Sequence, residues 1–236
     1  MDVKLEQGQD KTALSASPII SLSQVEVTLE ASAGPVEILR GVNFEVEAGA
    51  AVGIVGPSGS GKTTLLMVLA GLEGINAGTI EVCGHDLSKM DENELAAFRR
   101  DHVGIVFQSF HLIPAMTALE NVAVPLEFKG TANAYDKATQ ALERVGLGHR
   151  LTHYPAQLSG GEQQRVAIAR AMAAGASIIL ADEPTGNLDR ETGENIIELL
   201  FDMQRENGTT LLLVTHDPDL AEKCDRVCEV RDGLID

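Results

Sequence analysis

A glycine-rich segment carries the residues whose types and spacing point most directly to chemistry. It follows an apolar run from Ala50 to Val55 and reads Gly56-Pro57-Ser58-Gly59-Ser60-Gly61-Lys62-Thr63-Thr64. Its glycines let successive N–H groups point inward, and a helix starting after them directs its positive end to the same place. The segment predicts a phosphate site in which Lys62 reaches the terminal phosphates and Thr63 offers a hydroxyl to Mg²⁺. A ligand-free turn, the alternative, would not need Lys-Thr directly after the last glycine.

Two adjacent carboxylates end a second apolar run, Ile178 to Ala181. Charge at the end of a buried strand is costly unless a cation lies beside it. We therefore expect Asp182 to hold Mg²⁺, directly or through water. Glu183 would accept a proton from the water that attacks the γ-phosphate. A solvated strand end is the alternative, and it is common for an isolated Asp-Glu pair.

A third segment, Leu158-Ser159-Gly160-Gly161-Glu162-Gln163, has two interpretations. Ser159 and Glu162 have the spacing of a capping box at the start of a helix. That interpretation leaves the two glycines unexplained, because each costs about 1 kcal/mol relative to alanine inside a helix. Bare backbone at a helix N-terminus is what the close approach of a phosphate needs, so a phosphate contact is the second interpretation.

The surrounding pattern predicts an α/β fold that positions these segments. Strand-like stretches are expected at 19–28, 37–47, 50–55, 78–84, 103–107, 178–181, 210–214 and 226–230, the last of which closes the chain. Helices are expected from the phosphate segment to about 72 and at 90–100, 119–128, 135–145 and 162–174. A further helix carries Ile196, Ile197, Leu200 and Met203 at helical spacing, with Gly208 as its C-cap.

These stretches suggest one domain with an insertion. Residues 1–17 are polar and aperiodic, and we interpret them as a flexible tail. Residues 18–236 would form the sheet domain, and a helical subdomain at about 109–174 would be inserted into it because no strand-like stretch occurs there.

Composition limits the partners. The 236-residue chain is 44% apolar and has a formal charge of −17, so it offers no diffuse basic surface for a nucleic acid. Cys83, Cys224 and Cys228 show neither paired nor zinc-like spacing, which indicates reduced thiols. No run approaches the roughly 18 to 20 apolar residues of a membrane helix, and residues 1–18 lack the apolar core of a signal peptide. Any membrane role would therefore require a partner.

The ordered motifs resemble the ATP-binding cassette subunits of ABC transporters, from about residue 20 to the end. The LSGGEQ stretch is specific to that family, whereas the phosphate loop is shared by many NTPases. The motifs are GPSGSGKTT, Phe107-Gln108, LSGGEQQR at 158–165, IILADEPTGNLD at 178–189 and VTHD at 214–217. FQSFHLIP at 107–114, TALENV at 117–122 and DEPTGNLD look like the subgroup that serves lipoprotein release and macrolide export.

The resemblance implies a P-loop NTPase fold with a RecA-like sheet core, an antiparallel β subdomain and an inserted α-helical subdomain. It also implies ATP and Mg²⁺ as cofactors. Gln108 would sense the γ-phosphate, join Thr63 and Asp182 at the metal, and couple to a membrane partner. Ser159, Gly160, Gly161, Glu162 and Gln163 would clamp the γ-phosphate of a nucleotide bound by another subunit. Asp189 would lie in a loop that crosses the dimer interface, and His216 would contact the γ-phosphate as a switch. Judged without the family, Gln108 and His216 are simply polar residues after strands.

The function that follows is ATP hydrolysis coupled to work by an integral-membrane permease. The active form would be a head-to-tail pair on the cytoplasmic face of the inner membrane. A soluble cassette ATPase acting on DNA or the ribosome is the alternative, but such proteins need basic surface and usually a coiled coil or two cassettes. A small-molecule kinase would leave Ser159–Gln163 without a purpose.

One stretch departs from the family. Members usually place an aromatic residue before the second strand, where it stacks on adenine, and Val27–Val36 contains none. We expect Leu29 to lie nearest the base and nucleotide discrimination to be loose.

Overall fold

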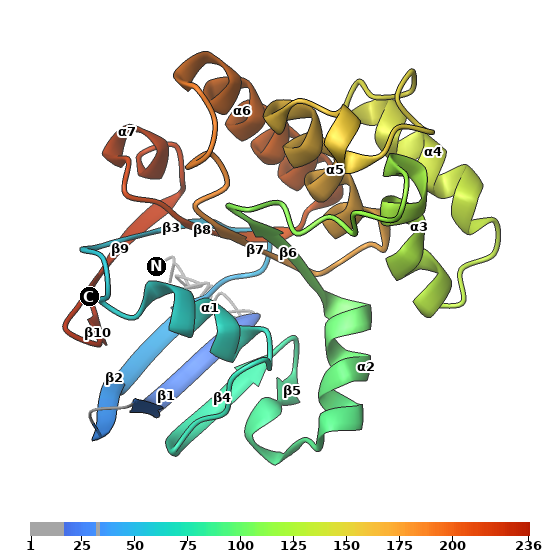
Figure 1. The fold of residues 1–236 in the computed structure, drawn as a ribbon. Coiled ribbons are helices and arrows are strands. Elements are labelled where there is room, and N and C mark those ends of the chain that lie inside the picture. Colours follow the sequence, from blue (N-terminus) through green and yellow to red (C-terminus); the bar gives the residue numbers. More distant parts are fainter. Residues whose placement is uncertain (1–16, 32–33) are drawn as a thin grey trace, which may run out of the picture.

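The computed structural model describes residues 17–31 and 34–236, so the predicted tail lies outside the described residues apart from residue 17. Two sheets form the framework (Figure 1). The larger has the order β10-β9-β3-β8-β7-β6, and its strands β9, β3, β8, β7 and β6 run parallel. Its bounds are β3 Ala51–Val55, β6 Val103–Phe107, β7 Ile178–Asp182, β8 Thr210–Val214, β9 Arg226–Arg231 and β10 Leu234–Ile235.

The parallel strands explain why the polar motifs meet. Strands β3, β7 and β8 are apolar runs buried along nearly their whole length, as expected for a parallel sheet covered on both faces. Asp182 pairs with Phe107 on one side and with Val214 on the other, and Val214 pairs with Ile54. The residues that follow these positions therefore emerge at one edge of the sheet, where ligands bind in open α/β folds.

The smaller sheet is antiparallel and has the order β2-β1-β4-β5. Its bounds are β1 Ile20–Ala31, β2 Gly34–Val46, β4 Ala77–Val82 and β5 His85–Asp86. Helix α1 (Lys62–Leu69) lies between the two sheets (Figure 1). Leu65, Leu66 and Val68 of this helix share one buried cluster with Val25 of β1 and Ile54 of β3. The phosphate segment is thus anchored by a helix buried on both sides.

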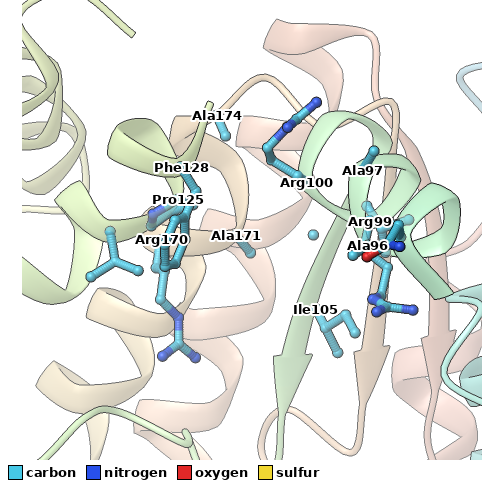
Figure 2. A pocket seen from close by; sticks show the side chains of 14 residues that line it. Ala96, Ala97, Arg99, Arg100, Ile105, Pro125, Phe128, Arg170, Ala171 and Ala174 are labelled. Carbon is cyan, nitrogen blue, oxygen red and sulfur yellow. The ribbon is translucent and has the colours of Figure 1, made fainter. Parts of the chain in front are cut away.

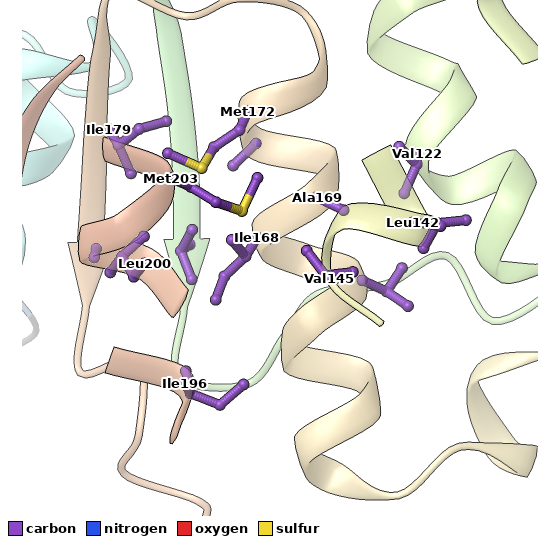
Figure 3. Packing of buried hydrophobic residues seen from close by; sticks show 14 of the residues in the cluster. Val122, Leu142, Val145, Ile168, Ala169, Met172, Ile179, Ile196, Leu200 and Met203 are labelled. Atoms are coloured by element: carbon purple, nitrogen blue, oxygen red, sulfur yellow. The ribbon is translucent and has the colours of Figure 1, made fainter. Parts of the chain in front are cut away.

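Helices cover the opposite face of the larger sheet. Residues 109–174 contain no strand, and their helices are α3 (Ala118–Phe128), α4 (Ala134–Arg144) and α5 (Gly160–Ala173). Helices α6 (Arg190–Asn207) and α7 (Pro218–Ala221) contribute to the cluster on this face, whereas Phe98 of α2 (Glu92–His102) belongs to the cluster between the two sheets. Figure 3 shows one continuous cluster in which Val122 and Leu142 lead through Ile168 to Met203 and Ile179 of β7. Helix α5 therefore belongs to the helical group and also packs on the sheet.

The predicted elements agree with the structure apart from their ends and five short elements, which are β5, β10, α7 and the 3₁₀ helices Leu87–Lys89 and Pro155–Gln157. Gly208 ends α6 in the left-handed region with φ of 63°, which confirms the predicted C-cap. The prediction that the strand at 226–230 closes the chain is wrong, because β10 follows it and pairs antiparallel with β9. Strands β5 and β10 have two residues each, too few to show an alternating pattern, and α7 has only one turn.

Candidate active site

The phosphate segment connects β3 to α1 in a conformation that only glycine allows. Gly56 has φ of +145°, and a Cβ added there would lie 2.1 Å from the carbonyl oxygen of Val230. Gly61 precedes α1 in the left-handed region, and no side chain caps the helix. Nζ of Lys62 donates to the carbonyls of Gly56 and Pro57, each at 2.8 Å, which holds the ammonium group over the loop.

The predicted metal-binding residues contact each other. Oγ1 of Thr63 donates to Oδ2 of Asp182 at 3.0 Å, so the start of α1 and the end of β7 present two hard oxygen ligands side by side. Mg²⁺ is typically held by one or two such protein groups together with water and phosphate oxygens. Among the described residues, no group of three or more His, Cys, Asp or Glu side chains could hold a metal. This sparse oxygen pair fits Mg²⁺ shared with a nucleotide.

Glu183 occupies an unusual backbone position. Its φ is +47°, a region that costs a non-glycine residue about 1 to 3 kcal/mol. Its N–H donates to the carbonyl of Val214 at 3.0 Å, and its Oε2 lies 2.8 Å from Nδ1 of His216. The Glu183 side chain is 20% exposed, and that of His216 is 75% exposed. The conformation thus turns the carboxylate toward the histidine at the edge of the sheet.

Gln108 is held by a residue that the sequence interpretation missed. Its Nε2 donates to Oδ1 of Asn187 at 3.3 Å, and Nδ2 of Asn187 donates to the Gln108 carbonyl at 2.9 Å. A Cβ at Gly186 would lie 2.6 Å from Nε2 of Gln108. Asn187 lies inside the quoted DEPTGNLD motif, which was the available signal.

Gln164 was also missed. It is fully buried, and its Nε2 donates to the carbonyl of Pro184 at 2.6 Å and to that of Phe107 at 3.5 Å. A buried amide is expected to be hydrogen-bonded, and this one joins α5 to the ends of β6 and β7. The signal was a second glutamine directly after the LSGGEQ stretch.

One cavity of about 460 Å³ brings most of the predicted residues together. The lining residues are Gly56, Ser58, Gly59, Gly61, Lys62, Thr63, Thr64, Gln108, Asp182, Glu183 and His216, with Ile38 and Val214. Pro57 and Ser60 are not among them, and the Ser60 hydroxyl is buried with no hydrogen-bond partner among the described residues. None of Ser159–Gln163 lines this cavity, and neither does Asp189.

The segment Ser159–Gln163 begins α5 with the predicted capping box. Oγ of Ser159 accepts from the Glu162 N–H at 3.2 Å, and Oε2 of Glu162 accepts from the Ser159 N–H at 2.8 Å. That N–H, with the Ser159 hydroxyl and Arg150, lowers the pKa of Glu162 below its ordinary value. Nε2 of Gln163 donates to the carbonyl of Leu158 at 3.1 Å.

The two glycines of this segment have a packing role that the sequence did not show. A Cβ at Gly161 would lie 2.5 Å from Cγ2 of Thr192, and one at Gly160 would lie 3.2 Å from Cδ2 of Leu188. Close approach of α5 to the start of α6 therefore explains Gly161 without any phosphate. Contrary to the expectation from sequence, packing thus accounts for one of the two glycines that the capping box alone does not explain.

Asp189 caps α6. Its Oδ1 accepts from the Thr192 N–H at 3.0 Å and its Oδ2 from the Thr192 hydroxyl at 2.7 Å, and these bonds lower the pKa of Asp189. Asp189 lines a second cavity of about 420 Å³, which also contains His216. His216 thus lies between the phosphate cavity and the segment that contains Asp189.

Ile38 of β2, and not Leu29 of β1, reaches the phosphate cavity. Both side chains are partly buried against the cluster between the two sheets, but only Ile38 lines the cavity. The expectation that Leu29 lies nearest the base therefore stays a prediction, with Ile38 as the alternative.

The family follows from comparison with known proteins. The sequence model of the ABC transporter family matches residues 39–186. The ABC transporter ATP-binding protein YbbA of Escherichia coli strain K12 is 48% identical over 224 residues, which are 94% of this chain and 98% of YbbA. The macrolide export ATP-binding/permease protein MacB of that strain is 44% identical over 221 residues, which are 93% of this chain and 34% of MacB.

Solved structures agree with these relatives. A dimeric structure of the ATP-binding cassette MJ0796 in a post-hydrolysis state, bound to ADP and Pi, superposes with a TM-score of 0.85. It is 40% identical and covers 92% of this chain and 96% of its own. Within residues 17–31 and 34–236, no helix combines the length and the apolar character needed to cross a bilayer. The chain belongs to the ABC transporter family, and it is an ATP-binding subunit that hydrolyses ATP.

Proposed function

We propose that this subunit binds MgATP in the phosphate cavity, hydrolyses it as a head-to-tail pair, and drives an integral-membrane permease. One observation carries the proposal. The phosphate loop, both carboxylates, Gln108 and His216 line one cavity, whereas the family-specific segment Ser159–Gln163 lies outside it. A single chain therefore contains one phosphate site and one separate segment suited to a second site.

Each polar residue of the cavity has its own role in ATP binding and hydrolysis. Loop N–H groups and Lys62 bind the phosphates. Thr63 and Asp182 would hold Mg²⁺, which would supply positive charge to the phosphate oxygens. Glu183 takes the proton of the attacking water. His216, 2.8 Å from Oε2 of Glu183, orients that carboxylate and contacts the γ-phosphate. Gln108, held by Asn187, positions the water and the metal.

A second copy completes each site. Ser159 and the free N–H groups at the start of α5 would close on the γ-phosphate bound by the other copy, and Asp189 would lie at the interface between copies. The dimeric MJ0796 cassette bound to ADP and Pi supports this arrangement. It is 40% identical over nearly the whole chain and has the same fold, so two copies of this chain could pair in the same way.

A third cavity, of about 610 Å³, supports a permease contact (Figure 2). Ala96 and Ala97 of α2 form one wall, and Phe128 of α3 lies opposite with 75% of its surface exposed. Arg170, which also lines the cavity, donates to the carbonyls of Phe110 and His111 at 2.9 and 2.7 Å. That loop follows Gln108, so an occupant of the cavity would act on the phosphate site.

The lining of this cavity indicates its partner. Its side chains are mostly apolar, and they include Arg99, Arg100 and Arg170 but no Asp or Glu. Arg99 pairs with Glu92, Arg100 pairs with Asp101, and Arg170 donates to backbone carbonyls, so these arginines already have partners. A permease segment with mainly apolar side chains would complement it. The relative MacB is described as an ATP-binding/permease protein, and this chain matches 34% of its length, which is consistent with such a partner. We place the subunit at the cytoplasmic face of the inner membrane, with export or lipoprotein extraction as the work driven.

The proposal includes a division of the chain into a domain and an inserted subdomain. Residues 18–236 would be one ATPase domain and residues 109–174 its helical subdomain. Contacts of α3 with α4 and of both with α5 support a cohesive helical group. The cluster that joins α5 to β7 would transmit its movement to the sheet.

Co-purification tests the proposal. The tagged subunit, extracted from native membranes in mild detergent, should carry an integral-membrane protein and hydrolyse ATP in a reaction abolished by chelating Mg²⁺. Phe128→Ser should release the membrane protein and retain nucleotide binding. Tyr135→Ser is the matched control, because Tyr135 is an exposed aromatic on α4 outside the cavity. Recovery of nucleic acid or ribosomes in place of a membrane protein would overturn the proposal.

A further inference from the structure

Arg150 contacts the family-specific segment from outside its motif. Its Nε donates to Oε1 of Glu162 at 2.9 Å, and the two side chains are partly buried, with 35% and 22% of their surfaces exposed. The other oxygen of Glu162 accepts the N–H of Ser159. The guanidinium and the Ser159 backbone are thus held by the two oxygens of one carboxylate.

His153 fixes Arg150 from the other side. Nη1 of Arg150 lies 3.1 Å from Nε2 of His153, and because a guanidinium has no acceptor, Nε2 must accept this hydrogen bond. The proton of the neutral imidazole then sits on Nδ1, which is buried and has no partner among the described residues. Leaving a buried donor unpaired costs free energy. His153 therefore holds Arg150 in place at the cost of an unpaired Nδ1–H group.

The backbone that carries Arg150 is itself anchored. The N–H of Arg150 donates to the Leu147 carbonyl, and the carbonyls of Leu151 and His153 accept from Leu119 and Ala118 at 3.0 and 2.8 Å. Those two donors belong to the first turn of α3, where N–H groups have no partner within the helix. The turn at 147–153 therefore bridges the starts of α3 and α5.

We propose that Arg150 is a positioning residue for the γ-phosphate clamp. By holding Glu162 it fixes the Ser159 main chain, and its charge offsets a carboxylate that would otherwise repel an incoming phosphate. This inference rests on the proposed function, in which Ser159–Gln163 closes on the nucleotide of a second copy. Arg150 touches neither nucleotide nor water and acts through Glu162.

ATP-driven pairing of the Glu183→Gln protein, measured by sedimentation over a range of ATP concentrations, tests this role. In that background Arg150→Ala should raise the ATP needed for half-maximal dimerisation about tenfold, the effect expected from losing one charge-assisted hydrogen bond. ATP affinity of the monomer should stay within about twofold. Arg144→Ala is the matched control, because Arg144 pairs with Glu206 on α6 and does not contact the clamp.

A double-mutant cycle separates positioning from general support. In a Glu162→Gln background the carboxylate is gone, so Arg150→Ala should change dimerisation by less than about twofold. Equal effects of Arg150→Ala with and without Glu162→Gln would overturn the inference. Arg150→Lys should restore part of the dimerisation, and it keeps the test open if Arg150→Ala fails to fold.

The two levels of the proposal fail differently. If Ser159→Asp leaves dimerisation intact, the clamp itself is wrong and the proposed function fails with it. If Ser159→Asp abolishes dimerisation but Arg150→Ala has no effect, only the role of Arg150 is refuted.

Discussion

The N-termini of helices α1 and α5 differ in how their free N–H groups are capped. Helix α1 begins after Gly61 with no side-chain cap and no acidic residue in its first turn. Helix α5 begins with Ser159 as a capping residue and Glu162 in its first turn. Uncapped N–H groups and a positive dipole end attract an anion without help, whereas a capped, carboxylate-bearing end has already satisfied part of that capacity.

The difference explains why one segment would bind nucleotide alone and the other would only clamp it. The α1 end lies in a cavity with Lys62, Asp182 and Glu183. The α5 end has its main contacts with its own helix, with α6 and with Arg150, outside that cavity. Variants at the first end should therefore change nucleotide binding by the monomer or the rate of the hydrolytic step, and variants at the second should change pairing.

The largest effects should arise in the phosphate cavity. Glu183→Gln should retain MgATP but hydrolyse it at least about a hundredfold more slowly, since a general base is lost. An ATP-bound dimer should then accumulate. Lys62→Ala should instead bind nucleotide poorly. Steady-state hydrolysis in the complex and equilibrium binding distinguish the two variants, and near-normal turnover of Glu183→Gln would refute the assignment of the base.

Ser159→Asp should affect only the second helix end. Aspartate caps a helix as well as serine does, so α5 should keep its structure, but the added carboxylate would face the γ-phosphate of the other copy. ATP-driven dimerisation should disappear while monomer affinity changes by less than about twofold. Thr117→Asp is a matched control, because Thr117 caps α3 with the same capping box, formed with Glu120. Normal hydrolysis by Ser159→Asp would favour a purely structural cap.

Gly161→Ala tests whether that glycine serves packing or phosphate. The new methyl group would clash with Cγ2 of Thr192, so the free energy of unfolding should fall by about 1 to 3 kcal/mol. Thr192→Ser removes this methyl and keeps the hydroxyl that donates to Asp189. Stability should therefore return in the double variant. Gly161→Ala alone should also reduce ATP-driven dimerisation. If the double variant dimerises again, packing accounts for Gly161, and if it does not, close approach of a phosphate is required.

Nucleotide choice should show the smallest effect. Without an aromatic stack, GTP should compete with ATP within about tenfold, a gap of about 1.4 kcal/mol. Ile38→Tyr would place a ring at the cavity wall and should tighten ATP binding by up to about tenfold. Leu29→Tyr is the control, because Leu29 does not line the phosphate cavity. A preference of the unmodified protein for ATP beyond a hundredfold would mean that another contact holds the base.

Cysteine chemistry offers no competing site. Burial raises the pKa of the Cys224 thiol to about 12 and raises those of Cys83 and Cys228 above their ordinary value. All three are free, as their spacing predicted. Such thiols are poorly ionised near neutral pH and react slowly.

Local features of this protein were readable from the sequence because they involve neighbouring residues. The capping box of Ser159 and Glu162 and the Gly208 C-cap each depend on backbone geometry within one turn. The buried strands were equally readable, because parallel strands covered on both faces are apolar throughout. The cost of placing carboxylates at the end of a buried strand then indicated that Asp182 would share Mg²⁺ with the phosphate site.

Tertiary structure decided the contacts between elements. Sequence spacing does not determine which carboxylate Arg150 meets, which side chain limits Gly161, or whether Leu29 or Ile38 reaches the cavity. Those outcomes depend on how the elements pack, as the close approach of α5 to α6 at Gly161 shows. Hydrophobic periodicity determines which face of an element is buried, but a rotation or slip of one residue changes the partner of every side chain on that face.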